Sequence, residues 1–323
     1  MRIGLDVMGG DFAPEVTIKG ALLSLDELPH DVQLVLIGDE AFLTTKLSGL
    51  NIPPGRIETV YSSEVIESGE KPLKAISTKQ NSSIVIGLRM LRKGEIDAFS
   101  SAGNSGAMLV GSMYSVGPIK GVIRPTTFAH IPQENGNTSI LLDIGTNTDT
   151  KADVLSQFAH LGFIYAQEVM GIEKPRVSLL NIGVEKGKGN LLTQSAYEMM
   201  HESKEYFFVG NIESRDLFNN KADVIVCDGF TGNILLKQIE AFYRIMQKRN
   251  LLDDYFERFN YENFGGSPIL GLNGTVVLGH GISSAIAIKN MLKLSYNIAT
   301  TRLSDKVKEA LYKYSNQQHF NRL

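Results

Sequence analysis

At least five apolar runs in this chain end in the same kind of turn, and this repetition restricts the fold more than any other feature. Each turn combines glycine with Asp, Asn, Ser, Lys or His, and most lead into residues with helical spacing. The turns lie at 8–14, 100–107, 143–149, 181–190, 229–233 and 279–281. Buried strands that alternate with helices are typical of a parallel α/β sheet. Because the carboxyl ends of parallel strands meet at one edge, these turns predict a ligand site there.

The turn at 100–107 carries the most specific chemistry. It contains two glycines and three hydrogen-bonding side chains, namely Gly103, Gly106, Ser101, Asn104 and Ser105. Free backbone N–H groups at a helix start, together with such side chains, suit a phosphate-sized anion. An ordinary capped helix is the alternative, and for an isolated Gly-x-x-Gly it would be the better interpretation. The recurrence of such turns along the chain favours the anion site.

The rest of the pattern predicts a regular alternation of elements. Strands are expected at 2–7, 32–37, 57–61, 96–99, 138–143, 176–182, 223–228 and 274–278. Helices are expected at 15–28, 84–93, 108–116 and 153–171, with two more starting at Ile234 and after Ser283-Ser284. A body built on one sheet, with one domain or two lobes, is the simplest account.

Composition excludes several classes of protein. A net charge of -3 offers no general basic field for nucleic acid. The single cysteine, Cys227, excludes an intrachain disulfide, and its apolar strand predicts an inert buried thiol. Cys/His pairs with zinc spacing are absent, no apolar run approaches the ~20 residues that span a bilayer, and no leader precedes Ile3. We therefore expect a cytoplasmic protein without a metal.

The common catalytic motifs are also missing. No Gly-x-Gly-x-x-Gly follows the first strand, and Gly183 to Lys188 lacks P-loop spacing. Neither Gly-x-Ser-x-Gly nor Cys-x-x-Cys occurs. A nicotinamide site and an acyl-enzyme nucleophile are therefore not expected.

Long stretches of the chain resemble the phosphate acyltransferases of bacterial phospholipid synthesis, the PlsX family. The matching stretches are 5–11 with 13–14, 101–107, 175–177 through 181–183, 227–233, 261–274 and 280–281. They follow the family's order along nearly the whole chain. The resemblance implies a three-layer Rossmann-like α/β/α sandwich, similar to isocitrate and isopropylmalate dehydrogenases. It implies one acyltransferase domain over 1–323, of one body or two lobes, with a short helical insertion near 240–262.

The same resemblance implies an activity and partners. Enzymes of this family transfer a fatty acyl group from acyl-acyl-carrier protein to inorganic phosphate, without a cofactor. The acyl phosphate is then handed to a glycerol-3-phosphate acyltransferase for phosphatidic acid synthesis. A cytoplasmic homodimer is implied, at most peripheral to the inner face of the membrane. Two alternatives stay open: a phosphate acetyltransferase that uses acetyl-coenzyme A, and a non-catalytic anion-binding protein of the same fold.

Carried over by position, the resemblance places the family's phosphate-contacting lysine and asparagine at Lys188 and Asn233, and the chemistry of the turn residues themselves suggests the other roles. The expected catalytic residues are Lys188, Asn233, His280 and Asp228. The expected phosphate-binding residues are Ser101, Gly103, Asn104, Ser105, Gly106 and Gly232, and further rim residues are Asp6, Gly9, Gly10, Asp11 and Asn147. Bound phosphate would attack the thioester directly while amide donors stabilise the oxyanion.

Several of these assignments have alternatives. Lys186 competes with Lys188, and His280 fits a simple turn as well as an acid or a phosphate-orienting group. Helix capping is the favoured role for Asp11. The 145–150 loop departs from the family's usual sequence, so its role stays open.

One segment bears on membrane contact. Residues 251–259 place Leu251, Leu252, Tyr255, Phe256 and Phe259 on one predicted helical stripe. The other side carries Asp253, Asp254 and Glu257 against Arg258 alone, whereas helices on anionic membranes usually carry Lys and Arg there. We therefore expect the stripe to pack against protein, across a dimer or over an acyl-chain entrance, and membrane binding to be weak and transient.

Overall fold

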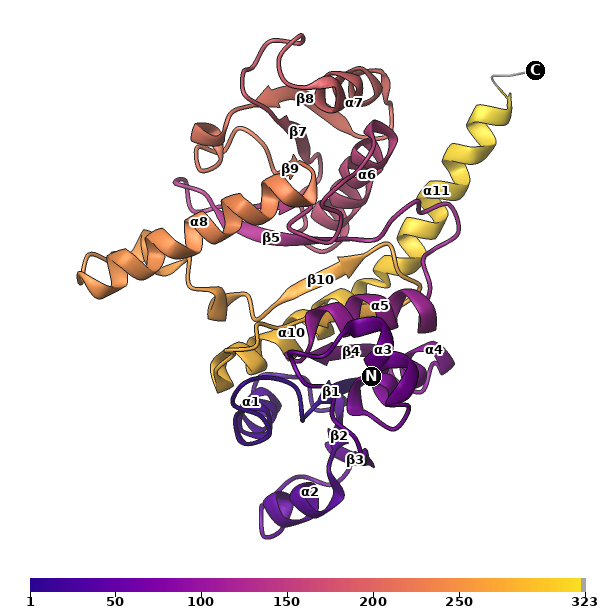
Figure 1. Ribbon diagram of the computed structural model, residues 1–323, viewed down its shortest axis with the longest axis vertical. Coiled ribbons are helices and arrows are strands. Elements are labelled where there is room, and N and C mark those ends of the chain that lie inside the picture. Colours follow the sequence, from indigo (N-terminus) through magenta and orange to yellow (C-terminus); the bar gives the residue numbers. More distant parts are fainter. Residues whose placement is uncertain (321–323) are drawn as a thin grey trace. The chain divides into compact units, whose positions relative to one another are not determined.

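The computed structural model describes residues 1–320, with side chains through residue 313, and it divides into two compact units (Figure 1). Unit 1 consists of 1–117 and 261–302, and unit 2 consists of 118–260 and the chain from Leu303 on. Each unit is an α/β structure. The predicted α/β class is therefore present in both units, whereas the expected acyltransferase domain over 1–323 stays a prediction.

Unit 1 has a mostly parallel sheet in the order β3-β2-β1-β4-β11-β10. Its strands are β1 (Arg2–Asp6), β2 (Gln33–Gly38), β3 (Ile57–Tyr61), β4 (Ala98–Ser101), β10 (Ser267–Leu270) and β11 (Thr275–Leu278). The pairings among β1, β2, β3, β4 and β11 are parallel, and β10 pairs antiparallel with β11. The carboxyl ends of β1, β4 and β11 consequently lie at the same edge.

The helices of unit 1 connect these strands. They are α1 (Glu15–Leu25), α2 (Glu40–Leu47), α3 (Pro72–Thr78), α4 (Ser83–Lys93), α5 (Ser105–Ser115) and α10 (Ala285–Thr301), with the short turn η2 (Tyr261–Asn263). Helix α4 shows how the sequence defines such an element. The Ser82 hydroxyl accepts a hydrogen bond from the Val85 N–H, and Gly94 ends the helix in the left-handed conformation. Between these caps, Ile84, Leu88 and Leu91 are buried in the core with Phe99.

Unit 2 has the sheet order β5-β6-β9-β7-β8. Its strands are β5 (Thr126–Pro132), β6 (Thr138–Leu142), β7 (Arg176–Leu180), β8 (Phe207–Ile212) and β9 (Val224–Val226). Strands β5 and β6 form an antiparallel hairpin, and the other pairings are parallel. The loops that follow β6, β9, β7 and β8 therefore share one edge of this sheet.

The helices of unit 2 are α6 (Ala152–Glu168), α7 (Leu191–Glu202), α8 (Gly229–Lys248), α9 (Asp254–Glu257) and α11 (Leu303–Phe320), with the short turn η1 (Ser214–Asp216). Helix α8 is the long orange helix in Figure 1. Its Leu235, Leu236 and Ile239 pack on a core that includes Leu141, Ile225 and Cys227. Among the described residues, no helix is long and apolar enough to cross a membrane.

Three sequence predictions were wrong about local structure. Helix α8 begins at Gly229 and not at Ile234, because the Asp228 side chain caps it, so the glycine turn is its first turn. Asp11 does not cap α1, whose N-cap position is Pro14 and has no side-chain cap. The expected helical stripe over 251–259 is reduced to the single turn α9, because Asp253 forms a new N-cap there.

Candidate active site

At the carboxyl edge of unit 1, the loops after β1, β4 and β11 lie against one another. The Asp11 N–H donates to the Gly281 carbonyl over 2.7 Å, and the Gly279 N–H donates to the Ser101 carbonyl over 2.8 Å. A Cβ atom at Gly9 would lie only 2.7 Å from the Gly103 nitrogen, so this contact requires glycine. Three of the predicted turns therefore do meet at one edge.

A buried carboxylate holds this edge together. Asp6 accepts hydrogen bonds from the Ser101 hydroxyl (2.7 Å) and the Met8 N–H (3.0 Å). The Ser101 oxygen in turn accepts from the Gly103 N–H over 3.0 Å. Burial raises the pKa of Asp6, and the hydrogen bonds oppose that change. Asp6 and Ser101 thus form the framework of the turn.

The predicted phosphate turn has a narrower set of free groups than its sequence indicates. The Asn104 oxygen accepts from the Ala107 N–H (2.9 Å), and its amide donates to the carbonyls of Glu67 (2.9 Å), Ser68 and Glu70. A Cβ atom at Gly106 would lie 2.5 Å from Pro72 Cγ. Ser105 is exposed, and within residues 1–313 its backbone N–H and that of Gly106 have no acceptor. These N–H groups at the start of α5 are what the turn offers an anion.

His280 lies on the same edge of unit 1, directly after β11. Its ring makes an edge-to-face contact with the Tyr261 ring, with centroids 4.9 Å apart. The Tyr261 hydroxyl donates to the Ile282 carbonyl over 3.1 Å, which fixes this aromatic partner. Gly10 lies between these loops, since a Cβ atom there would be 3.3 Å from the Gly281 oxygen. The histidine is half-buried and held in orientation.

In unit 2, a second buried carboxylate shapes the loop after β6. Asp143 accepts hydrogen bonds from the N–H groups of Gly145 (2.9 Å), Thr146 (2.9 Å) and Asn147 (2.7 Å), and from the Asn147 side-chain amide (2.7 Å). Burial raises the pKa of Asp143, and these hydrogen bonds act in the opposite direction. The predicted rim residue Asn147 also donates to the Pro125 carbonyl (2.9 Å), so its side chain serves the loop.

The first turn of α8 packs onto this loop. Asp228 caps the helix by accepting from the Thr231 N–H (2.9 Å) and hydroxyl (2.8 Å), which places it in a structural position. A Cβ atom at Gly232 would overlap the Asp143 carbonyl oxygen, so this approach requires glycine. The Asn233 amide donates one hydrogen bond, to the Ile144 carbonyl over 3.0 Å.

The two lysines of the loop after β7 differ in their partners. Lys186 forms an ion pair with Glu198 over 2.8 Å, which raises the pKa of the lysine. Lys188 is exposed, and among the side chains that the structure describes its ammonium group has no ion pair. Its loop is fixed, because the Asn181 amide donates to the Lys188 carbonyl over 3.1 Å. Lys188 is therefore the lysine that is available to an anion.

A cavity of about 550 Å³ opens at this edge of unit 2. Most of its exposed lining is apolar, but seven polar or charged residues also line it: Asn181, Asn190, Thr193, Glu213, Ser214, Thr231 and the α8 N-cap Asp228. Cys227 lines it too, but burial raises the pKa of this thiol well above its usual range, as expected for an inert core cysteine. Within residues 1–313, no three His, Cys, Asp or Glu side chains are grouped to hold a metal ion.

Sequence reasoning missed two of these features. Asp143 organises the loop, and its signal was an acid directly at a strand end before Gly-Thr-Asn. The cavity had no signal in any single stretch, since its lining comes from several loops and from α8.

Fold and site together define an α/β protein whose sheet edges offer donors for an anion and, in unit 2, an apolar cavity. The profile of the family described as "Fatty acid synthesis protein" matches residues 1–306. A phosphate acyltransferase of Caldanaerobacter subterraneus is 41% identical over 96% of this chain and 97% of its own length. One of Dictyoglomus thermophilum is 40% identical over 98% and 99%. The chain belongs to the phosphate acyltransferase family, and the resemblance is confirmed.

Solved structures with low sequence identity share the fold. A phosphotransacetylase from Streptococcus pyogenes gives a TM-score of 0.66 at 15% identity, covering 93% of this chain and 94% of that one. A 4-hydroxythreonine-4-phosphate dehydrogenase from Klebsiella pneumoniae gives 0.55 at 12% identity, covering 93% and 97%. These neighbours confirm the predicted α/β fold class. As a member of its family, the chain is an acyltransferase.

Proposed function

We propose that this acyltransferase moves a fatty acyl group from acyl-acyl-carrier protein to inorganic phosphate. The observation that supports a fatty acyl group is the cavity of about 550 Å³ beside the start of α8, whose exposed surface is mostly apolar although polar residues such as Asn181 and Glu213 also line it. An acetyl group would fill a small part of such a cavity, whereas drug-sized apolar ligands occupy cavities of roughly 300–1,000 Å³. This favours a long acyl group over the acetyl group of the alternative that the sequence left open.

The proposed reaction is a direct transfer. A phosphate oxygen attacks the thioester carbonyl carbon, the carbon–oxygen bond forms, and the carbon–sulfur bond breaks. The carrier thiolate leaves with the electron pair of that bond. Lys188, whose ammonium group has no ion pair among the described side chains, would neutralise phosphate charge. The exposed start of α8 would face the developing oxyanion.

Asn233 fits the oxyanion role because, among the residues that the structure describes, one of its two amide hydrogens is bound, by the Ile144 carbonyl, and the other has no acceptor. This bond also fixes the direction of the second hydrogen. In unit 1, the Ser105 and Gly106 N–H groups are the other candidates for phosphate, and His280 is the candidate acid or phosphate-orienting group. Asp228, Asp6, Ser101 and Asn147 are proposed to position these groups through the hydrogen bonds described above.

Family membership also supports the remaining parts of the proposal. These are a homodimer, a carrier protein as donor, and delivery of the acyl phosphate to a glycerol-3-phosphate acyltransferase in the cytoplasm. Membrane contact is proposed to be weak, because Tyr255, Phe256 and Phe259 pack on one another and Phe259 packs on Phe218 of the same unit.

Mass detection of acyl phosphate tests the proposal. The protein is mixed with palmitoyl-carrier protein and phosphate, and release of carrier thiol is followed in parallel. We expect acyl phosphate and thiol in equal amounts, and neither without phosphate. Acetyl-coenzyme A serves as the alternative donor, and faster turnover with it would replace the proposal by an acetyltransferase. Thiol release that does not depend on phosphate would overturn direct transfer.

A further inference from the structure

A second cavity in unit 2 runs along α8 and has no role in the chemistry described so far. Its volume is about 490 Å³, and apolar side chains provide nearly all of its lining. Helix α8 contributes Leu235, Ile239, Tyr243 and Met246, at spacings of four, four and three residues. Such spacing lines one face of a helix. At 1.5 Å per residue, Leu235 to Met246 spans about 17 Å, roughly the length of an extended chain of a dozen carbons.

Aromatic side chains form the opposite wall of this groove. Tyr255 lies with its ring centroid 5.3 Å from those of Phe256 and Phe259. The wall is fixed to the β5–β6 hairpin, since Arg258 donates to the carbonyls of Gln133 (2.9 Å), Gly136 (2.9 Å) and Asn137 (2.6 Å). The segment that the sequence presented as a helical stripe is thus a wall that the chain's own hydrogen bonds hold in place.

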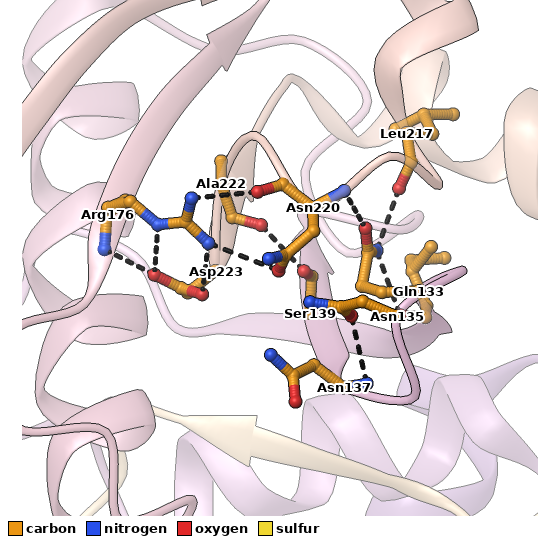
Figure 2. A network of polar contacts seen from close by, with 10 residues as sticks. Gln133, Asn135, Asn137, Ser139, Arg176, Leu217, Asn220, Ala222 and Asp223 are labelled. Atoms are coloured by element: carbon orange, nitrogen blue, oxygen red, sulfur yellow. Dashed lines mark hydrogen bonds and ion pairs between the residues drawn. The ribbon is translucent and has the colours of Figure 1, made fainter.

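The floor of the groove is equally well fixed. Leu217 and Phe218 line it, and Phe218 meets Phe259 edge to face at 5.6 Å. Figure 2 shows the polar network next to this floor. The Gln133 amide donates to the Leu217 carbonyl (2.8 Å), and its oxygen accepts from the Asn220 N–H (2.7 Å). A groove with a fixed floor and wall binds a ligand with little loss of conformational entropy.

The groove adjoins the candidate active site of unit 2. Leu235 and Ser214 line both the 490 Å³ groove and the 550 Å³ cavity that contains Asp228 and Thr231. A linear ligand can therefore start at the first turn of α8 and continue along the same helix to Met246. This continuity indicates an apolar tail attached to a polar, reacting head.

We propose that the groove binds the hydrocarbon chain of the acyl donor, and that α8 sets the accepted chain length. The α8 side chains that line the groove lie at successive distances from the active site, with Ile239 near the middle of the groove and Met246 at its far end. The inference rests on the proposed function for the identity of the donor. An anionic membrane is the alternative occupant, because Lys237, Arg244 and Lys248 of α8 accompany the acidic Glu134, Asp253 and Glu257 in this region, and sedimentation with anionic liposomes tests it. A second copy of the chain is the other alternative, and sedimentation velocity tests it.

Chain-length series test this directly. Saturated fatty acids of 8, 12 and 16 carbons displace a fluorescent fatty acid from the full-length protein and from Ile239→Trp, Met246→Trp and Arg244→Trp. Each further buried methylene should tighten binding to the wild type about fourfold. We expect Ile239→Trp to stop this gain after roughly the shortest acid, and Met246→Trp to affect the longest acid alone. Arg244 is exposed and outside the groove, so its variant is the matched control and should follow the wild type.

Activity and assembly separate the possible failures. If the wild type binds long chains as expected but forms no acyl phosphate, the proposed function fails and the groove assignment stands. If Ile239→Trp is folded and active with an unchanged preference among donors of 8, 12 and 16 carbons, the groove assignment fails and the function stands. Sedimentation velocity measures whether Ile239→Trp dissociates a dimer. Dissociation with unchanged affinity for the fatty acids would overturn the groove assignment in favour of a subunit contact. Should Ile239→Trp fail to fold, Ile239→Ala is expected to widen the groove and weaken binding of the 12-carbon and 16-carbon acids alone.

Discussion

Replacing Asp143 with Asn should destabilise unit 2 strongly, because the carboxylate is fully buried and both oxygens accept hydrogen bonds. The oxygen that faces Gly145 and Thr146 can remain an acceptor. The other becomes an NH₂ group that points at two donors of Asn147, so two charged-acceptor bonds are lost. At about 1.5–3 kcal/mol each, the cost is about 3–6 kcal/mol of unfolding free energy.

Urea denaturation followed by circular dichroism at pH 7 measures this cost on the full-length protein. Asp149→Asn is the matched control, since Asp149 is an exposed carboxylate in the same loop, and its change should stay within about 0.5 kcal/mol. The Asp143 variant should also lose turnover, because the loop contacts Asn233 and the first turn of α8. An unfolding free energy within about 1 kcal/mol of the wild type would refute the reasoning.

Four further predictions concern single residues. Lys188→Ala should raise the KM for phosphate at least tenfold and leave the KM for acyl-carrier protein unchanged, because an ammonium group binds an anion and not an acyl chain. The control is Lys186→Ala, which breaks the ion pair with Glu198, and a larger rise of the phosphate KM in that variant would reverse the assignment. Asn233→Ala should lower kcat by roughly 10²–10³ as an oxyanion donor does, and wild-type turnover would remove it from the mechanism. His160 is buried and burial lowers its pKa to about 4, so the unfolded chain takes up its proton first as the pH falls. Lowering the pH from 7 to 5 should thus reduce the unfolding free energy of the wild type by about 2 kcal/mol more than that of His160→Gln. Identical pH profiles of the two proteins in urea denaturation would contradict this. Anionic liposomes at low salt should sediment little of the protein, whereas strong co-sedimentation lost in a folded Phe256→Glu dimer would assign the aromatic wall to lipid.

The sequence predicts those parts of the fold that depend on local rules. Helix α4 follows from one capping serine, one apolar stripe and one C-terminal glycine, and the structure places all three as expected. The alternation of apolar runs with polar glycine turns likewise predicts the parallel sheets and the edges where these turns lie. Local rules failed at 228–234, because a glycine-rich turn and the first turn of a capped helix look alike in sequence.

The candidate site depends on contacts that no single stretch contains. Asn104 looks like a ligand-binding amide in sequence, but the loop at 67–70 accepts its hydrogen bonds. Lys186 and Lys188 are equivalent by spacing, and Glu198 of α7 distinguishes them. Hydrogen-bond and ion-pair partners that are distant in sequence decide which polar groups remain available to a ligand. The sequence therefore predicts where the turns lie, but not which of their donors are free.

The division of unit 1 into two chain segments affects how the protein can be made. When residues 1–260 have emerged from the ribosome, all strands of unit 2, β5 to β9, have been synthesised. In unit 1, however, β4 still lacks its neighbour β11, and β10 is also missing. Until 275–278 emerge, the nascent chain exposes an unpaired, apolar strand edge, the kind of surface that invites aggregation. We expect truncation before residue 275 to give insoluble protein, and chaperone dependence to end once this late strand has been inserted.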